Sequence, residues 1–580
     1  MATFDDVFHY IGPYGKYQWR VFVLLFILAI PAALQTYMNT FTFATPSHRC
    51  RLPAFPHDQY LLNASSPEAA LVDRLVPRSA TDNATYDTCH YFNHSGVYPN
   101  VTIEPNASLV ECTSWVYDHT YYPDNIVTRL RLYCHSEFLV IVANSFTFVG
   151  MLLGSIVFGD ISDRFGRHAA ICLGLLGLLI FGVATAYMKS FGAIIALRTL
   201  AMMCSYGMNL AGFVLMIELF GPSARTTVSM VAGMMFGAGT MLFGIIGYYV
   251  RPWVWLQLVA TVPVAALLSY YFLVPESPRW LLTKGRLIRF KKVIFAAATV
   301  NHKTIPQTFI DDLVKDQLEA ADPTNPSSQK SQTVSIFSLV RYPNMAFKTF
   351  ILCFTWFVIN TVFYGITMNL TSMPGNPFVK VIISGAVEIP AHLVVLLFMY
   401  FLGRRIILSG TLIFAGFSCF LCAWVQTYPD VVNVLAQFGK FNISASFTVV
   451  YIFSGEIFPT EMRTSGIGLC SVCARIGGIV ASIVVQRAVD EHQPEFPLSV
   501  FGILGFAAGV LVLNLPETRN KVLPETLEQA ETFGRPRICG WRGSKKNYDA
   551  GISRSGNGDS TDSAQALLDD VDSEEETRQV

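Results

Sequence analysis

Long apolar stretches, each of about 20 residues, recur along the chain and are separated by short polar connections. An apolar helix of that length crosses the hydrocarbon core of a bilayer, so each stretch predicts one membrane-spanning helix. We predict twelve such helices, with approximate limits 21–44, 138–159, 169–188, 192–217, 226–250, 252–274, 349–368, 380–402, 406–427, 431–454, 464–486 and 497–515. An even number of spans places both ends of the chain on one side of the membrane.

The composition fits a multi-pass membrane protein. Hydrophobic residues make up 52% of the 580 positions and charged residues only 14%, compared with roughly 25% charged residues in soluble domains. Basic and acidic residues balance at 41 each, so the net charge gives no indication of a nucleic-acid partner. Residues 1–20 lack the basic start and short apolar core of a cleaved signal peptide, and we expect the first span to direct the chain into the bilayer.

Basic residues gather on the connections of one side of this topology, and the positive-inside rule makes that side cytoplasmic. We therefore expect cytoplasmic termini at 1–20 and 516–580, a cytoplasmic connection at 275–348, and membrane halves at 21–274 and 349–515. The C-terminal tail is rich in acidic residues and serine, which predicts that it is largely disordered. The basic residues are Arg164, Arg167, Arg225, Lys284, Arg286, Arg289, Lys291, Lys292, Arg404, Arg405 and Arg463.

The segment 45–137 falls on the outer side and has the features of an extracellular, glycosylated loop. Its four cysteines predict two disulfides in an oxidising compartment, and the sequence does not select among the three pairings that four cysteines allow. Five N-x-S/T sequons indicate glycosylation and a place in the plasma membrane. The cysteines are Cys50, Cys89, Cys112 and Cys134, and the sequons are at Asn63, Asn83, Asn93, Asn100 and Asn106. The other cysteines lie mostly in spans and include the pairs CFLC at 419–422 and CSVC at 470–473. Zinc or redox chemistry at these pairs would need further ligands and access to water, which the sequence does not provide, so no metal or cofactor is expected.

Several sequence landmarks occur twice at a nearly constant offset. Glu218 and Arg225 in IELFGPSAR match Glu456 and Arg463 in GEIFPTEMR at an offset of 238 residues. The tripeptide FGR at 165 matches LGR at 402 with an offset of 237, and PES at 275 matches PET at 516 with an offset of 241. A repeat of this length predicts two copies of a six-helix unit. Secondary transporters built in this way hold their substrate between the halves, near the midplane.

The stretch GDISDRFGR at 159–167 resembles the loop signature of the major facilitator superfamily, which lies between the second and third helices. Further motifs resemble the organic ion transporters of that superfamily, the group of organic cation, organic anion and carnitine transporters. They run along most of the chain: ATPSHRC, CTSWVYD, VPESPRWLL, CFTWF, GEIFPTEMR and LPETRNKVLPET. The resemblance implies an all-α membrane protein with the major facilitator fold, twelve transmembrane helices in two six-helix halves.

The resemblance also implies a conformational gate on the cytoplasmic face. Gly159 would permit close helix approach, and Asp163 with the following arginines would make charge contacts that hold one conformation. A solvated turn is the alternative for such a cluster. In the second half, YFLGRR lacks the aspartate and arginine pair, which predicts a weaker or different latch. The gate residues are Gly159, Asp163, Arg164, Gly166, Arg167, Glu218, Arg225, Glu456 and Arg463.

Four ionisable residues lie deep in predicted spans, where a charge is costly and marks a functional site by default. Arg198 is near the outer end of its helix and could reach the interface with its long side chain. Glu388 precedes Pro390 in a helix that we expect to be kinked, and Lys440 either lines a cavity or is paired. Arg475 is the deepest, eleven residues from either end of its helix.

Arg475 bears on the charge of the substrate. At the matching position, cation transporters of the resembled family carry an aspartate, whereas anion and carnitine transporters carry a basic residue. A guanidinium in a low-dielectric cavity can bind a carboxylate through two parallel hydrogen bonds. Two alternatives remain. Glu388 neutralises Arg475 as a structural pair, or both contact a carnitine-like or betaine-like zwitterion, with Glu388 and aromatic faces on its quaternary ammonium.

Aromatic residues complete the predicted substrate site. Trp356, Phe363 and Tyr364 lie on or near one face of CFTWFVINTVFYG, and Phe447 matches an aromatic residue that lines the cavity of the resembled family. Aromatic residues in spans more often face lipid or core, so the family match is what favours the cavity. The predicted substrate-binding residues are Arg475, Glu388, Trp356, Phe363, Tyr364, Phe447 and Lys440.

Together these observations predict a polyspecific secondary transporter that moves small organic ions by alternating access, with organic anions or carnitine-like zwitterions favoured. An organic cation transporter of the same family, or a transporter-like receptor that moves no substrate, is the alternative. A channel would need a pore-lining segment and an enzyme a catalytic constellation such as H-E-x-x-H, and the sequence shows neither. The expected partners are a small organic ion, a co-transported or exchanged ion, and the lipid bilayer.

Overall fold

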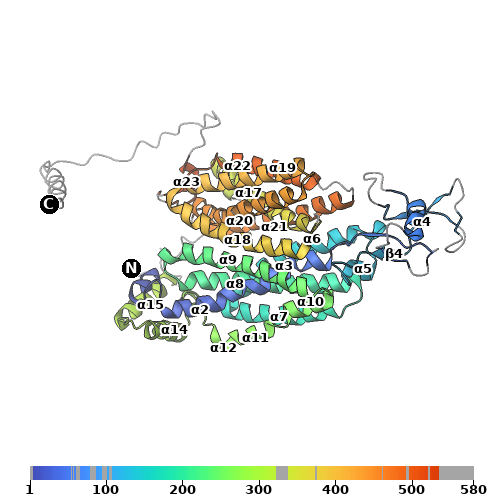
Figure 1. The fold of residues 1–580 in the computed structure, drawn as a ribbon. Coiled ribbons are helices and arrows are strands. Elements are labelled where there is room, and N and C mark those ends of the chain that lie inside the picture. Colours follow the sequence, from blue (N-terminus) through green and yellow to red (C-terminus); the bar gives the residue numbers. More distant parts are fainter. Residues whose placement is uncertain are drawn as a thin grey trace, which may run out of the picture. The chain divides into compact units, whose positions relative to one another are not determined.

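The structure is a computed structural model, and the residues it describes are 4–534 apart from 54, 56–57, 61–65, 79–85, 95–100, 103–106, 322–337, 373–374, 460, 491–494, 520, 522 and 525. Helices dominate these residues and form two groups, residues 16–273 and residues 343–512, which Figure 1 shows as two neighbouring bundles. The two groups correspond to the two halves that the internal repeat predicts.

The N-terminal half contains six membrane spans. The first consists of α2 (Lys16–Ile27) and α3 (Ala29–Thr42), and the sixth of α10 (Trp253–Thr261), α11 (Val264–Leu267) and α12 (Tyr270–Leu273). The break at Leu28 comes three residues before Pro31, and the break between α10 and α11 contains Pro263. Each proline lacks the backbone N–H that would continue the helical hydrogen bonds. The spans between them are continuous: α6 (Phe138–Phe165), α7 (Arg167–Ala186), α8 (Phe191–Leu219) and α9 (Pro222–Tyr249).

The C-terminal half supplies the other six spans. Eleven described helical segments are long and apolar enough to cross a membrane. The further long helix, α20, has 29 residues and carries Asp430, Lys440 and Glu456, which lower its apolar character. The twelve spans therefore match the prediction to within one or two helical turns. Those of this half are α17 (Pro343–Ser372), α18 (Pro377–Phe401), α19 (Arg404–Trp424), α20 (Pro429–Ile457), α21 (Arg463–Asp490) and α22 (Glu495–Val512).

The halves contact each other mainly where α9 packs against α18 and α6 packs against α21. Glycines allow this close approach, because small residues let helix backbones come together in a membrane. A Cβ atom on Gly385 would lie 2.4 Å from the backbone nitrogen of Met241, and one on Gly478 would lie 2.3 Å from the ring of Phe148. The interface between the halves is thus tightly packed near the middle of the spans.

An aromatic cluster also joins the halves at the end that carries residues 45–137, which we call the loop side. Phe378, in the first turn of α18, packs against three aromatic residues of the N-terminal half. Its ring centre lies 4.8 Å from that of Phe41, 5.9 Å from that of Tyr122 and 6.5 Å from that of Tyr248. This Phe378 cluster holds the two halves together on the loop side.

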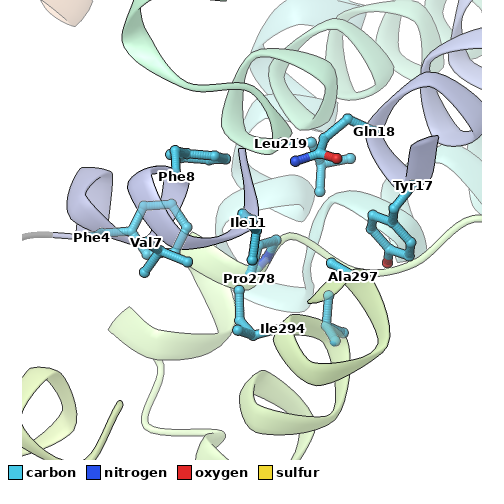
Figure 2. Close-up of a pocket in the computed structure, with 11 residues that line it drawn as sticks. Phe4, Val7, Phe8, Ile11, Tyr17, Gln18, Leu219, Pro278, Ile294 and Ala297 are labelled. Atoms are coloured by element: carbon cyan, nitrogen blue, oxygen red, sulfur yellow. The ribbon is translucent and has the colours of Figure 1, made fainter. Parts of the chain in front are cut away.

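The opposite end, which we call the terminal side, carries a set of short helices (Figure 1). Val7, Phe8 and Ile11 are buried against the helices that follow the sixth span, and Figure 2 shows the small apolar pocket between them. Asn301 fastens this layer to the first span, because it accepts a hydrogen bond from the Tyr17 backbone (2.8 Å) and donates one to the Ile11 carbonyl (3.0 Å). The elements are η1 (Phe4–Asp6), α1 (Val7–Ile11), α13 (Pro278–Thr283), α14 (Leu287–Val300), α15 (Gln307–Ala321), α16 (Ser338–Arg341) and α23 (Leu527–Thr532).

On the loop side, the described part of 45–137 contains two small antiparallel sheets. One pairs β1 (His48–Cys50) with β4 (Trp115–Tyr117), and the other pairs β2 (His90–Phe92) with β3 (Leu109–Glu111). Three short helical segments accompany them: α4 (Pro67–Leu75), α5 (Ile126–Leu130) and η2 (Cys134–Ser136). A buried ion pair between Arg49 and Asp58 (2.5 Å) fixes the loop that follows β1.

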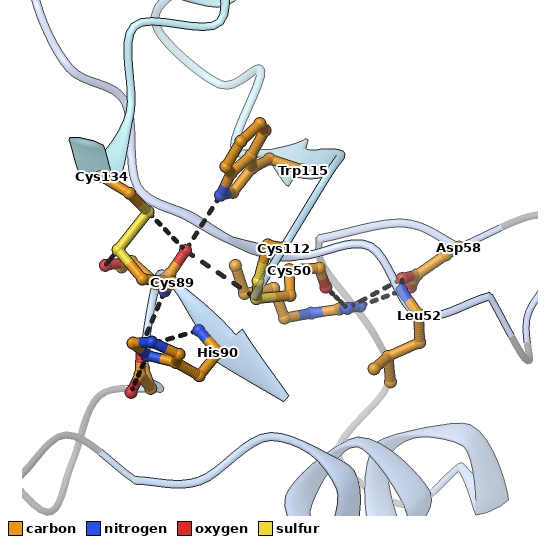
Figure 3. Close-up of a disulfide and its surroundings, with 11 residues drawn as sticks. Cys50, Leu52, Asp58, Cys89, His90, Cys112, Trp115 and Cys134 are labelled. Carbon is orange, nitrogen blue, oxygen red and sulfur yellow. Dashed lines mark hydrogen bonds and ion pairs between the residues drawn. A yellow bond between two sulfur atoms is a disulfide. The ribbon is translucent and has the colours of Figure 1, made fainter. Parts of the chain in front are cut away.

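The four loop cysteines form the disulfides Cys50–Cys112 and Cys89–Cys134, one of the three pairings that the sequence allows (Figure 3). The indole nitrogen of Trp115 donates a hydrogen bond to the Thr88 carbonyl beside Cys89, so the first sheet is held against the second disulfide. Among the predicted glycosylation sites, Asn93 is exposed. The others, Asn63, Asn83, Asn100 and Asn106, lie outside the described residues.

Candidate functional site

Arg475 lies in the middle of α21 and is buried, with 3% of its surface exposed. Its guanidinium donates a hydrogen bond to the hydroxyl of Tyr206 on α8 and lies 4.5 Å from the centre of the Tyr206 ring. This contact combines a charge-assisted hydrogen bond with a cation–π interaction. Because α8 and α21 belong to different halves, the Tyr206 and Arg475 contact spans the interface where transporters of this architecture hold substrate.

The guanidinium of Arg475 retains unused binding capacity. Its Nε atom is buried and has no hydrogen-bond partner among the described residues. Its electrostatic neighbours are the hydroxyl-bearing rings of Tyr206, Tyr364 and Tyr451, and no carboxylate of the described chain pairs with it. A buried guanidinium with a free donor is an incomplete site that an anionic group would satisfy.

The four predicted aromatic residues meet in one continuous chain of ring contacts beside Arg475. Trp356 packs edge-on against Tyr451 (4.3 Å between ring centres), and Tyr451 packs against Phe447 (5.7 Å). Phe447 in turn contacts Phe363 (5.4 Å), which contacts Tyr364 (5.1 Å). The chain runs between α17 and α20 and offers ring faces and edges next to the guanidinium.

Glu388 on α18 pairs with Lys440 on α20, with 3.1 Å between carboxylate and ammonium. Both side chains are buried, with exposures of 2% and 0%. The ammonium also donates to the hydroxyl of Thr367 (2.8 Å) and lies 3.2 Å from the centre of the Phe363 ring. Of the two alternatives predicted for Lys440, pairing is therefore the one found, and Glu388 is paired with Lys440 rather than with Arg475.

The charged groups inside the spans are mostly positive. Among the described residues, Glu388 is the one carboxylate buried within a span. The buried basic side chains of the spans are Arg198, Lys348, Lys380, Lys440 and Arg475. Lys348 and Lys380 lie within the first two turns of α17 and α18, so Arg198, Lys440 and Arg475 are the buried basic residues that lie deeper in the described spans.

Arg198 has a polar partner inside the N-terminal half. It is buried in α8 and donates a hydrogen bond to the amide oxygen of Gln257 on α10 (3.0 Å). The Gln257 amide nitrogen donates a hydrogen bond to the hydroxyl of Thr261 (3.1 Å). The same hydroxyl accepts a hydrogen bond from Gln35 (3.1 Å). The structure thus places Arg198 in a polar network within the N-terminal half, away from the Arg475 contact.

At the terminal side of the N-terminal half, Arg167 is the centre of a charge cluster. Its guanidinium contacts Glu218 on α8 (3.1 Å) and Asp163 on α6 (3.1 Å). Its backbone N–H donates to Glu276 (2.8 Å), which caps the start of α7. Gly166 has a φ of 112°, and a Cβ atom there would lie 2.0 Å from the Glu276 carboxylate, so glycine is required at this position.

The C-terminal half repeats this cluster. Arg404 contacts Glu456 (3.4 Å), and its backbone N–H donates to Glu517 (2.9 Å). A Cβ atom on Gly403 would lie 2.0 Å from Glu517, as for Gly166 and its glutamate. The offsets of 237, 238 and 241 residues in the sequence repeat therefore correspond to equivalent contacts in space.

The other predicted gate residues have separate surroundings. Arg225 pairs with Asp5 of η1 (2.7 Å), Arg164 forms an exposed pair with Asp160 (2.7 Å), and Arg463 begins α21. A Cβ atom on Gly159 would have no heavy atom within 4 Å, so in this conformation no described helix packs closely against it, and its role in a gate stays a prediction.

Several residues of the site escaped the sequence prediction. Tyr206 and Tyr451 are single tyrosines in apolar helices, and nothing in the sequence separates them from tyrosines that face lipid. Tyr37 (3.4 Å from the Lys440 ammonium) and Thr367 are equally inconspicuous. The depth of Lys440 and Glu388 in their spans singled out both residues, but the partner that the sequence suggested for Glu388 was Arg475, not Lys440.

Comparisons with known proteins agree with this architecture. Residues 28–530 match the family described as "Sugar (and other) transporter". The chain is 34% identical to "Organic cation transporter protein" of Drosophila melanogaster, over 92% of this chain and 95% of that protein. It is 30% identical to "Solute carrier family 22 member 13" of Homo sapiens, over 93% of this chain and 95% of that protein.

Solved structures share the fold at low sequence identity. The proton:xylose symporter XylE of the major facilitator superfamily, bound to 6-bromo-6-deoxy-D-glucose, superposes with a TM-score of 0.59 at 15% identity, covering 90% of this chain and all of the symporter. The partially occluded inward-open xylose transporter of E. coli gives a TM-score of 0.57 at 14% identity, covering 88% of this chain and 100% of that one. These likenesses show the fold alone.

Proposed function

Because the chain belongs to the family of sugar and other transporters, and within it to the organic ion transporters, we propose that it is a secondary transporter of small organic anions. The observation that carries this proposal is the pairing of charges in the site. Glu388 forms an ion pair with Lys440, whereas Arg475 has no carboxylate partner among the described residues. A substrate carboxylate would supply the missing partner.

Electrostatics favours an anion at this place. Arg475, Lys440 and Glu388 together carry one uncompensated positive charge. Opposite unit charges about 4 Å apart attract by about 4 kcal/mol at an effective dielectric constant of about 20. The planar guanidinium adds geometric fit, because it can bind both oxygens of a carboxylate. An organic cation would be repelled by Arg475 and would find the carboxylate of Glu388 already occupied.

The aromatic chain favours substrates with a flat apolar body. Tyr451, Phe447 and Phe363 present ring faces and edges beside the guanidinium. An aromatic carboxylate such as benzoate could place its charge on Arg475 and its ring against these side chains. We propose aromatic monocarboxylates as the first substrate class to test.

The position of Arg475 connects substrate binding with movement of the halves. An anion that takes the hydrogen bond now made to Tyr206 would change a contact between the halves. Such a ligand shifts the conformational equilibrium by its different affinity for the two arrangements. The Arg167 and Arg404 clusters each lie within one half, so we propose that they stiffen the halves during alternating access.

We further propose that the loop side is extracellular and that both termini are cytoplasmic, in the plasma membrane. The two disulfides and the exposed Asn93 support an oxidising, glycosylating compartment for 45–137. The basic connections support a cytoplasmic terminal side. We also propose that transport of the substrate is coupled to a co-transported or exchanged ion, whose identity is not specified.

The second candidate is transport of organic cations, because a relative of 34% identity is named an organic cation transporter. A carnitine-like zwitterion is less favoured, since its quaternary ammonium would have to displace Lys440 from Glu388. Both alternatives are outcomes of the same experiment.

The test compares uptake of labelled benzoate, L-carnitine and tetraethylammonium in cells that express the wild type, Arg475→Lys or Arg475→Gln, with each rate normalised to surface protein. We expect benzoate uptake in the wild type, weaker uptake in Arg475→Lys and none in Arg475→Gln. Uptake of tetraethylammonium without uptake of benzoate in the wild type would overturn the proposal. Binding without any uptake would indicate a receptor.

A further inference from the structure

The ammonium group of Lys440 lies in surroundings that suit an organic cation. It contacts the Glu388 carboxylate at 3.1 Å and the centre of the Phe363 ring at 3.2 Å. The Tyr37 ring centre lies 5.8 Å away, and the Thr367 hydroxyl accepts a hydrogen bond at 2.8 Å. A carboxylate combined with aromatic faces is the recognition chemistry for alkylammonium ligands.

Stability alone does not explain this ion pair. Lys440 is fully buried, and charged groups at such a depth in a span are costly. Replacing a buried ion pair by well-packed apolar residues is often neutral or stabilising. A lysine and a glutamate kept together at this depth therefore point to a role beyond packing.

The pair also lies between the halves. Tyr37 comes from α3 of the N-terminal half, whereas Lys440, Glu388 and Phe363 come from the C-terminal half. A Cβ atom on Gly237 of α9 would lie 2.9 Å from the Cβ of Glu388, so the carboxylate borders the N-terminal half directly. This is the position at which transporters built from two repeats hold their substrates.

We propose that Lys440 is a specificity-determining residue that acts as a built-in cation. Its ammonium fills a cation subsite formed by Glu388, Phe363 and Tyr37, and so keeps cationic substrates out of a transporter that takes anions at Arg475. The inference rests on the proposed function for the role of Arg475. The conclusion that Lys440 occupies a cation subsite does not depend on the proposed function, because it follows from the contacts of Lys440 alone.

The proposal predicts that removal of the lysine side chain converts the subsite into a site for free cations. In Lys440→Ala three methylene groups and the ammonium are lost, which frees space next to an unpaired carboxylate. A mobile cation would then restore the neutrality of Glu388 and occupy the aromatic faces. Lys440→Arg keeps a tethered cation and serves as the matched control.

The experiment measures uptake of labelled tetramethylammonium and tetraethylammonium in cells that express the wild type, Lys440→Ala, Lys440→Arg, or the double variant Lys440→Ala with Glu388→Gln. Rates are normalised to surface protein. We expect uptake of at least one cation in Lys440→Ala to exceed that of the wild type about tenfold or more. Lys440→Arg and the double variant should show no gain, because the first still fills the subsite and the second lacks its carboxylate.

Two results would overturn the inference: surface-delivered Lys440→Ala that takes up no more cation than the wild type, or an equal gain in the double variant. If Lys440→Ala does not reach the surface, the readout is the melting temperature of the purified full-length variants with and without tetramethylammonium. The cation should then raise the melting temperature of Lys440→Ala alone, and the absence of that difference counts against the inference. Benzoate uptake by the wild type, measured in parallel, tests the proposed function separately.

Discussion

The hydroxyl of Tyr206 in the N-terminal half accepts a hydrogen bond from the guanidinium of Arg475 in the C-terminal half, and its ring lies against the same guanidinium at 4.5 Å. Tyr206 therefore makes two contacts with the buried guanidinium, a hydrogen bond through its hydroxyl and a cation–π contact through its ring. An incoming carboxylate competes with the hydroxyl but not with the ring. The Tyr206 hydroxyl therefore competes with the substrate carboxylate for the guanidinium of Arg475.

Tyr206→Phe tests this competition, because phenylalanine keeps the ring and removes the hydroxyl. A hydrogen bond to a charged group contributes about 1.5–3 kcal/mol, part of which the substrate must replace. We expect a lower KM for benzoate, by about threefold to tenfold, together with slower turnover, because one contact between the halves is lost. A KM that rises would show that Tyr206 binds substrate instead of competing with it.

Gly166 and Gly403 test whether the repeated glutamate caps hold the terminal side in place. An added methyl group at either glycine meets a glutamate at 2.0 Å, and Gly166 also has a positive φ. Gly166→Ala and Gly403→Ala should each destabilise the protein by about 1–3 kcal/mol and lower the melting temperature of the purified protein. Gly159→Ala is the matched control, since it meets no atom within 4 Å. A loss in Gly159→Ala equal to that in Gly166→Ala would contradict this reasoning.

The disulfide pairing makes a prediction for the loop side. Removal of a native disulfide typically costs 2–5 kcal/mol, so Cys50→Ser and Cys89→Ser should both reduce the amount of surface protein. Peptide mapping without reduction should give a Cys50 to Cys112 link in Cys89→Ser and a Cys89 to Cys134 link in Cys50→Ser. Any other linkage in these variants would show that the pairing is wrong.

The Phe378 cluster predicts a gate on the loop side. Phe378→Ala removes the ring that contacts Phe41, Tyr122 and Tyr248, and with it the aromatic contacts between the halves at this end. We expect a larger share of molecules open on the loop side. A cysteine introduced at Thr367, a buried position of α17 beside Lys440, should react with a membrane-impermeant thiol reagent several times faster in the Phe378→Ala background. Unchanged labelling would mean that the cluster packs without gating.

The sequence predicts most of the fold because span length, charge bias and repeat spacing are local or periodic properties. The repeat offsets even locate Arg167 and Arg404 in equivalent clusters. The sequence does not predict which buried charged side chains pair with each other, because that depends on which helices become neighbours. Glu388 was a reasonable partner for Arg475 until α18 and α20 placed it next to Lys440. Tyr206 was missed because its role comes entirely from the opposite helix.

The central claim is that Arg475 binds the carboxylate of the substrate, and a comparison of charged and neutral ligands tests it most directly. Binding of benzoate and of its neutral analogue benzamide is measured on purified wild type and Arg475→Gln. We predict that the wild type binds benzoate about 10- to 100-fold more tightly than benzamide, since charge-assisted hydrogen bonds contribute about 1.5–3 kcal/mol, and that Arg475→Gln binds the two alike. Equal affinities in the wild type, or a preference for benzoate that survives in Arg475→Gln, would contradict the account.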